Sequence, residues 1–104
     1  MSKVYQYDLK VFEISSLGEQ NYSVPWYEYH MIVISLGNYG NYNTSVVVTS
    51  DYMSQTSVGN RVQIKDDNLV LEVLQNGYEE LKFIASGSIS VNKQVKILSF
   101  MKKL

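Results

Sequence analysis

The chain has 104 residues, 45% of them hydrophobic, with a net charge of −1 and no cysteine. This length predicts a single domain covering residues 1–104. The lack of cysteine excludes disulfides, thiolate chemistry and cysteine-based zinc sites. No stretch approaches the roughly 18 apolar residues of a membrane span, and the first residues lack a signal-peptide pattern. We therefore expect a cytoplasmic protein that does not contact a membrane.

Alternating apolar and polar residues predict strands through most of the chain. The first strand is expected at 4–14, followed by a loop at 15–23. The central strand is expected at Trp26–Leu36, and the polar loop Gly37–Asn43 follows it. Further strands are expected at 44–49, 58–65, 69–75 and 78–86.

Three segments carry more specific expectations. Residues 50–57 could form one helical turn capped by Ser50 or Asp51. Asn76-Gly77 predicts a type I′ hairpin that sets Gln75 opposite Tyr78. The tail from residue 94 fits a strand or a helix, and we favour a strand. The pattern as a whole predicts a small antiparallel β-barrel, OB-like, with five to seven strands and little or no helix.

Residue chemistry argues against catalysis. His30 is the only histidine, and no second imidazole or carboxylate cluster accompanies it at metal-ligand spacing. No Gly-x-Ser-x-Gly elbow and no phosphate-binding Gly-Lys loop occurs. We expect no enzyme activity, no metal and no cofactor.

Binding is the function that remains, and tyrosine is the residue in excess, with nine against three Phe and one Trp. Tyr39 and Tyr42 lie among glycines and asparagines in a polar loop, a composition that suits contacts to a protein or stacking on unpaired bases. Arg61 and Lys65 share one face of a strand. They would form a groove with the tyrosines if the strands adjoin. If they meet Glu79 or Glu80 instead, they are ordinary exposed ion pairs.

The segments 24–38, 46–49 and 59–64 show a pattern that resembles the single-stranded-DNA-binding proteins of filamentous phages. The pattern is a long central strand ending Leu-Gly-Asn, a valine-rich strand and a Gly-x-x-Val-x-Ile strand. The resemblance implies an OB-like barrel, a homodimer and bases stacked on exposed tyrosines, with Trp26, Tyr27 and Tyr29 near the binding strand. Two departures are the low basic charge and the final hairpin and tail, which have no counterpart in that family.

Three functions follow from these observations. The first is binding of single-stranded DNA or RNA by a viral or mobile-element protein acting in the host cytoplasm. Tyrosine stacking and a Lys/Arg groove would carry it, through Trp26, Tyr27, Tyr29, Tyr39, Tyr42, Arg61 and Lys65. The second is a small viral protein-binding module, such as a host-factor inhibitor or an assembly adaptor. The third is a structural subunit of a virion that associates through its edge strands.

Overall fold

The computed structural model describes residues 6–38, 41–49, 61–76 and 80–101. These residues form strands and one short 3-10 turn, which confirms the predicted all-β fold with little helix. The elements are β1 (Tyr7–Ile14), β2 (Gly18–Val24), η1 (Trp26–Glu28), β3 (Tyr29–Asn38), β4 (Asn41–Thr49), β5 (Arg61–Asp66), β6 (Leu69–Asn76), β7 (Glu80–Gly87) and β8 (Lys93–Met101).

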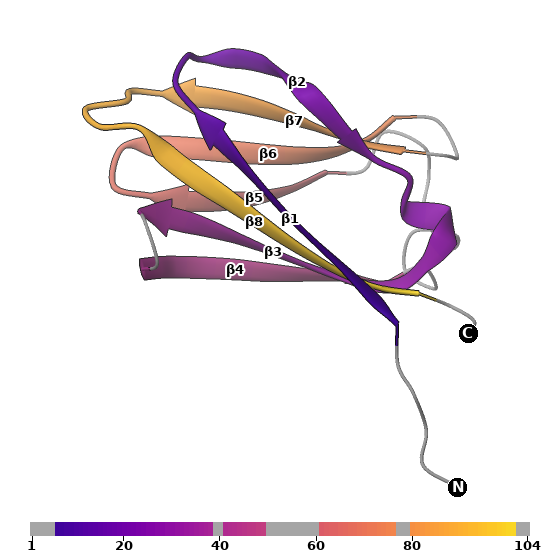
Figure 1. The fold of residues 1–104 in the computed structure, drawn as a ribbon. Helices are drawn as coiled ribbons and strands as arrows, with labels where there is room; N and C mark the ends of the chain where they lie inside the picture. Colours follow the sequence, from indigo (N-terminus) through magenta and orange to yellow (C-terminus); the bar gives the residue numbers. More distant parts are fainter. Residues whose placement is uncertain (1–5, 39–40, 50–60, 77–79, 102–104) are drawn as a thin grey trace, which may run out of the picture.

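The strands form two antiparallel four-stranded sheets that lie one over the other (Figure 1). One sheet has the order β1-β8-β3-β4 and the other has the order β2-β7-β6-β5. The chain changes sheet four times: between β1 and β2, between β2 and β3, between β4 and β5, and between β7 and β8. The last strand, β8, enters between β1 and β3 and pairs with both, so the predicted strand in the tail is confirmed for the residues that the structure describes.

The core lies between the two sheets and consists of alternate residues of nearly every strand, as a two-sheet fold requires. Phe83 is fully buried at its centre, and the rings of Phe12 and Tyr22 pack beside it, 4.6 Å apart and nearly parallel. Aliphatic side chains fill the remainder: Ile14, Ile32, Ile34, Leu36, Ile64, Leu69, Leu71, Val73, Leu81, Val95 and Ile97.

The strand β2 lies where a loop was predicted, and it raises the number of described strands above the expected five to seven. Its sequence is mostly polar, which conceals the period of two. Tyr22 and Val24 nevertheless point inward, and the stacking of Tyr22 on Phe12 attaches this strand to the core.

The central strand begins later than predicted. Trp26–Glu28 is a 3-10 turn, in which the backbone N–H of Glu28 donates to the carbonyl of Pro25 at 3.2 Å. The fixed φ of proline, here −78°, suits the entry to such a turn. The extended region therefore starts only at Tyr29 and continues to Asn38.

The predicted pairing of Gln75 with Tyr78 is wrong, because Gln75 lies opposite Leu81. The observed register differs from the predicted one by three residues, and an odd shift exchanges the two faces of a strand. In the observed register the inward residues Val73 and Phe83 are partners, whereas the predicted one would place Val73 opposite Glu80. Burial of the core therefore overrides the local preference of Asn-Gly for a two-residue turn. The helical turn predicted at 50–57 lies outside the described residues.

Candidate interaction face

Some of the aromatic residues that the sequence predicts on a binding surface lie in the core, and others lie on the exterior. Trp26 and Tyr29 are buried in the core, at 5% and 7% exposure, whereas Tyr27 is exposed. The Tyr29 hydroxyl donates to Asp8 Oδ2 at 2.8 Å. Burial and this hydrogen bond raise the pKa of Tyr29 to about 12. Trp26 and Tyr29 therefore serve the fold rather than an exposed stacking surface, and Tyr39 lies outside the described residues.

The predicted cations lie on the other sheet. Arg61 and Lys65 project from the outer side of β5, and Arg61 Nη1 is 2.8 Å from Glu72 Oε2 on β6. Glu72 is the partner that the structure gives Arg61, Glu79 lies outside the described residues, and the pair is of the exposed kind that contributes little. Tyr42 belongs to the sheet formed by β1, β8, β3 and β4, so the structure does not bring Tyr42 together with Arg61 and Lys65.

Tyr42 instead meets a cation that the sequence did not single out. The ammonium of Lys96 lies 4.6 Å from the centre of the Tyr42 ring, within cation–π range. The Tyr42 hydroxyl donates to Gln94 Oε1 at 3.1 Å. Both partners are on β8, so this tyrosine is held flat against its own sheet.

The most unusual surface of the molecule is the outer side of the β1-β8-β3-β4 sheet. Its strand register aligns apolar side chains into rows that cross the whole sheet. One row is Leu9, Leu98, Val33 and Val47, and the neighbouring row is Tyr7, Phe100, Met31 and Thr49. We call the apolar members of these rows, together with Val11, the outer apolar face.

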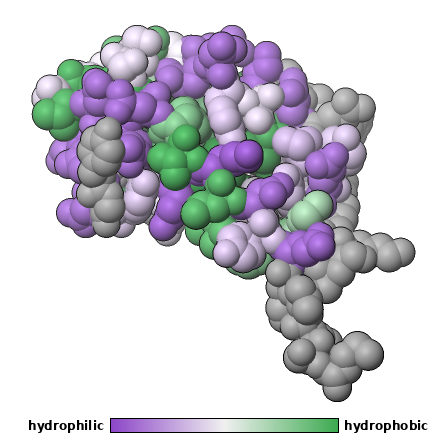
Figure 2. Space-filling view, viewed as in Figure 1, coloured by the Kyte–Doolittle hydropathy of each residue, from purple (hydrophilic) through white to green (hydrophobic). Residues whose placement is uncertain are grey.

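This face is open to solvent. Tyr7, Leu9, Val11 and Val47 are 59%, 54%, 49% and 55% exposed. Figure 2 shows hydrophobic groups gathered across the middle of this side of the molecule. An antiparallel sheet normally presents polar residues on a solvated side. Exposed apolar side chains aligned in this way make the face a candidate interaction site.

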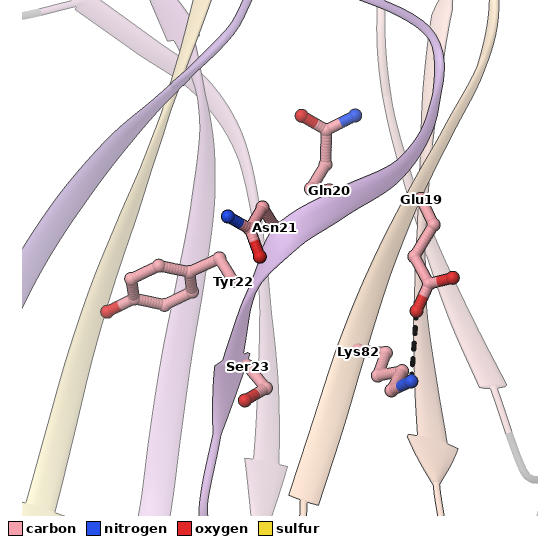
Figure 3. Close-up of a pocket in the computed structure, with 6 residues that line it drawn as sticks. All are labelled: Glu19, Gln20, Asn21, Tyr22, Ser23 and Lys82. Atoms are coloured by element: carbon pink, nitrogen blue, oxygen red, sulfur yellow. Dashed lines mark ion pairs between the residues drawn. The ribbon is translucent and has the colours of Figure 1, made fainter.

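A separate polar pocket of about 400 Å³ lies beside β2 and β7 (Figure 3). The ladder between these strands is irregular from Glu19 to Ser23, and the side chains of Gln20 and Tyr22 flank the opening. Lys82 Nζ is 3.0 Å from Glu19 Oε1, which raises the pKa of Lys82. Lys82, the one cation among the described lining residues, is thus already paired, and the pocket is shallow, so it is a weaker candidate than the apolar face.

No protein-family model, curated protein or solved structure matches this chain. Function must therefore be inferred from the surface itself. Within the described residues, no group of His, Asp and Glu could hold a metal ion. None of the described helical segments has the length and apolar character needed to cross a bilayer.

The sequence-based site missed the apolar face, although one signal for it was present. In β8, Val95 and Ile97 occupy one side while Leu98 and Phe100 occupy the other, so the strand is apolar on both sides near its end. Such a strand is expected to be covered on both sides. In β1 the same holds for Phe12 and Ile14 against Leu9 and Val11.

Proposed function

We propose that this domain is a protein-association module and that the outer apolar face is its docking surface. The observation that carries the proposal is the uninterrupted aliphatic row Leu9, Leu98, Val33 and Val47, which runs from one edge of the sheet to the other. Burial of these half-exposed apolar side chains stabilises a complex by about 25 cal/mol for each Å² removed from water. A protein partner with its own apolar side is the ligand that gains most from this surface.

The sheet edges are less suited to association than the face. Lys10 occupies an inward register position opposite Ile97 on the edge strand β1, yet it is exposed. Inward-pointing charges on edge strands hinder edge-to-edge pairing. At the opposite edge, the Asn43 side-chain amide donates to Asp66 Oδ1 at 3.1 Å and joins β4 to β5. Face docking is therefore favoured over strand addition.

Site-specific photo-crosslinking tests the proposal. A photoreactive amino acid replaces Val47, which lies on the face, or Val91, which is equally exposed in the connection between β7 and β8. In cells producing the protein, we expect a discrete protein adduct from position 47 and little from position 91. Equal yields from both positions, or no adduct from position 47, would refute a docking role for the face.

Single-stranded nucleic-acid binding by an OB-like viral protein is the second candidate, and one observation favours it. Tyr42 and Lys96 place a ring and a cation side by side at the margin of the same face. Stacked bases and phosphates need this combination. Titration with single-stranded oligonucleotides at increasing salt is the test, because phosphate contacts make affinity fall with salt. We expect Tyr42→Ala to weaken such binding by about 1–3 kcal/mol, and absence of binding at low salt would exclude this function.

A further inference from the structure

We infer that the partner docked on the outer apolar face is a second copy of this chain, packed sheet against sheet about a two-fold axis. This inference rests on the proposed association function and adds the identity of the partner. Three properties of the face support it: its charge, its area and its form.

The charges of the face favour a copy of itself. Among the described residues on the outer side of this sheet, Glu13 and Lys96 are the only charged side chains. They have opposite sign, so the face is neutral, and two copies meet without net repulsion. The ammonium of Lys96 is also held over the Tyr42 ring, while the residue borders the aliphatic row beside Leu9 and Leu98. The whole chain has a net charge of only −1, which keeps long-range repulsion between copies small.

The area is near the size that a specific dimer needs. Strands spaced about 4.8 Å and side-chain rows spaced about 7 Å give an outline of about 400 Å² for four strands and three rows, which are the two rows above and the adjoining row of Val11, Lys96, Ser35 and Ser45. Two such faces in contact would bury about 800 Å² in total if they were flat. Protruding side chains raise this buried area toward the ~1,000 Å² of a specific interface. A monomer would leave this whole area in water.

The form of the face also suits a copy. Stacked sheets pack about 10 Å apart with strand directions within about 30° of each other, an angle that arises from their twist. Two copies of one sheet have the same twist by necessity. A two-fold axis lying between them makes each residue contact self-complementary, which is the commonest geometry of homodimers. The rings of Tyr7 and Phe100 flank the aliphatic row on one side and provide area for such contacts.

Light scattering coupled to size exclusion tests the inference on the purified full chain. We expect twice the monomer mass for the wild type at high concentration, with dissociation on dilution. Leu9→Glu and Val47→Glu place a charge on the face from its two edge strands and should each weaken the dimer more than about tenfold, or about 1.4 kcal/mol. Both positions are solvent-exposed, so circular dichroism should show an unchanged fold.

Matched controls separate the face from exposed apolar surface in general. Leu17→Glu and Val91→Glu change the same residue types at 47% and 54% exposure, in connections outside the sheet. They should leave the dimer intact. A wild type that stays monomeric at the highest attainable concentration, or a loss of dimer in the controls equal to that in the face variants, would overturn the inference.

The crosslinking adduct distinguishes failure of this inference from failure of the proposed function. Mixed light and heavy isotope-labelled chains, crosslinked from position 47, should give adducts that contain one chain of each kind. An adduct with a different protein overturns the second copy as partner but keeps the association function. Absence of any adduct from position 47 overturns both.

Discussion

Lys93 is expected to be the charged residue on which folding stability depends most. It is 3% exposed at the start of β8, and its Nζ lies 2.9 Å from Asp67 Oδ2 and 3.1 Å from Asp66 Oδ2. Lys93 Nζ donates a hydrogen bond to Asp67 Oδ2 and forms an ion pair with buried Asp66. The hydrogen bond and both charges raise the pKa of Lys93 despite burial. The ammonium thus joins β8 of one sheet to the β5–β6 turn of the other.

Lys93→Met removes the cation and leaves the carboxylate of Asp66, only 6% exposed, with the side-chain amide of Asn43 as its remaining described partner. Breaking a buried ion pair from one side costs about 3–5 kcal/mol. The free energy of unfolding of a domain of this size is about 5–15 kcal/mol, so this loss is a large fraction of it. Asp67 is 71% exposed, and Asp67→Asn should cost less than about 1 kcal/mol.

Urea unfolding followed by the fluorescence of buried Trp26 measures these differences. The double variant Lys93→Met/Asp66→Leu replaces both charges by apolar groups and should recover to within about 1 kcal/mol of the wild type. Because the folded-state pKa of Lys93 is raised, the stabilisation is complete below the ordinary lysine pKa. It is lost as pH rises through the raised value. Equal losses for Lys93→Met and Asp67→Asn, or no recovery in the double variant, would refute this account.

Three further substitutions test other contacts. Tyr29→Phe removes a phenol whose pKa is raised to about 12 by burial and Asp8. Between the ordinary tyrosine pKa and about 12, the folded wild type binds more protons than the unfolded chain, so its free energy of unfolding should fall as pH rises. Urea unfolding at alkaline pH should show a weaker pH dependence for Tyr29→Phe than for the wild type. Gln75→Leu should stabilise the fold by about 1–3 kcal/mol, because the buried amide of Gln75 has no hydrogen-bond partner among the described residues. An unchanged urea midpoint would contradict this. Gly87→Ala should destabilise far more than Gly18→Ala. Both glycines have positive φ, which alone costs an alanine about 1–2 kcal/mol. An added Cβ at Gly87 would also collide with a backbone carbonyl, whereas Gly18 faces open space, and similar melting temperatures would refute the distinction.

Much of the local structure follows from the sequence. The β-branched run Ile32–Ile34 and the alternation of Val95 and Ile97 with Lys96 predict strands, and both strands occur. Side-chain direction in a strand depends only on neighbours along the chain. The same rule failed at β2, where polar residues conceal the period.

The site required information that local patterns do not contain. Tyr29 and Tyr42 are chemically alike and both lie near or in strands, yet one enters the core and the other lies on Lys96. Arg61 could equally have faced a tyrosine or an acid until the register placed it beside Glu72. These outcomes depend on which strands become neighbours.

The sequence by itself therefore determined a cysteine-free β-domain, most of its strands and the inward side of several of them, because period-two burial is a local property of the chain. Only the tertiary structure decided that β8 lies between β1 and β3. That insertion sets Leu98 between Leu9 and Val33 and turns separate apolar residues into one surface. Strand neighbours are chosen by contacts between segments far apart in sequence, and such contacts leave no repeat for a local pattern to show.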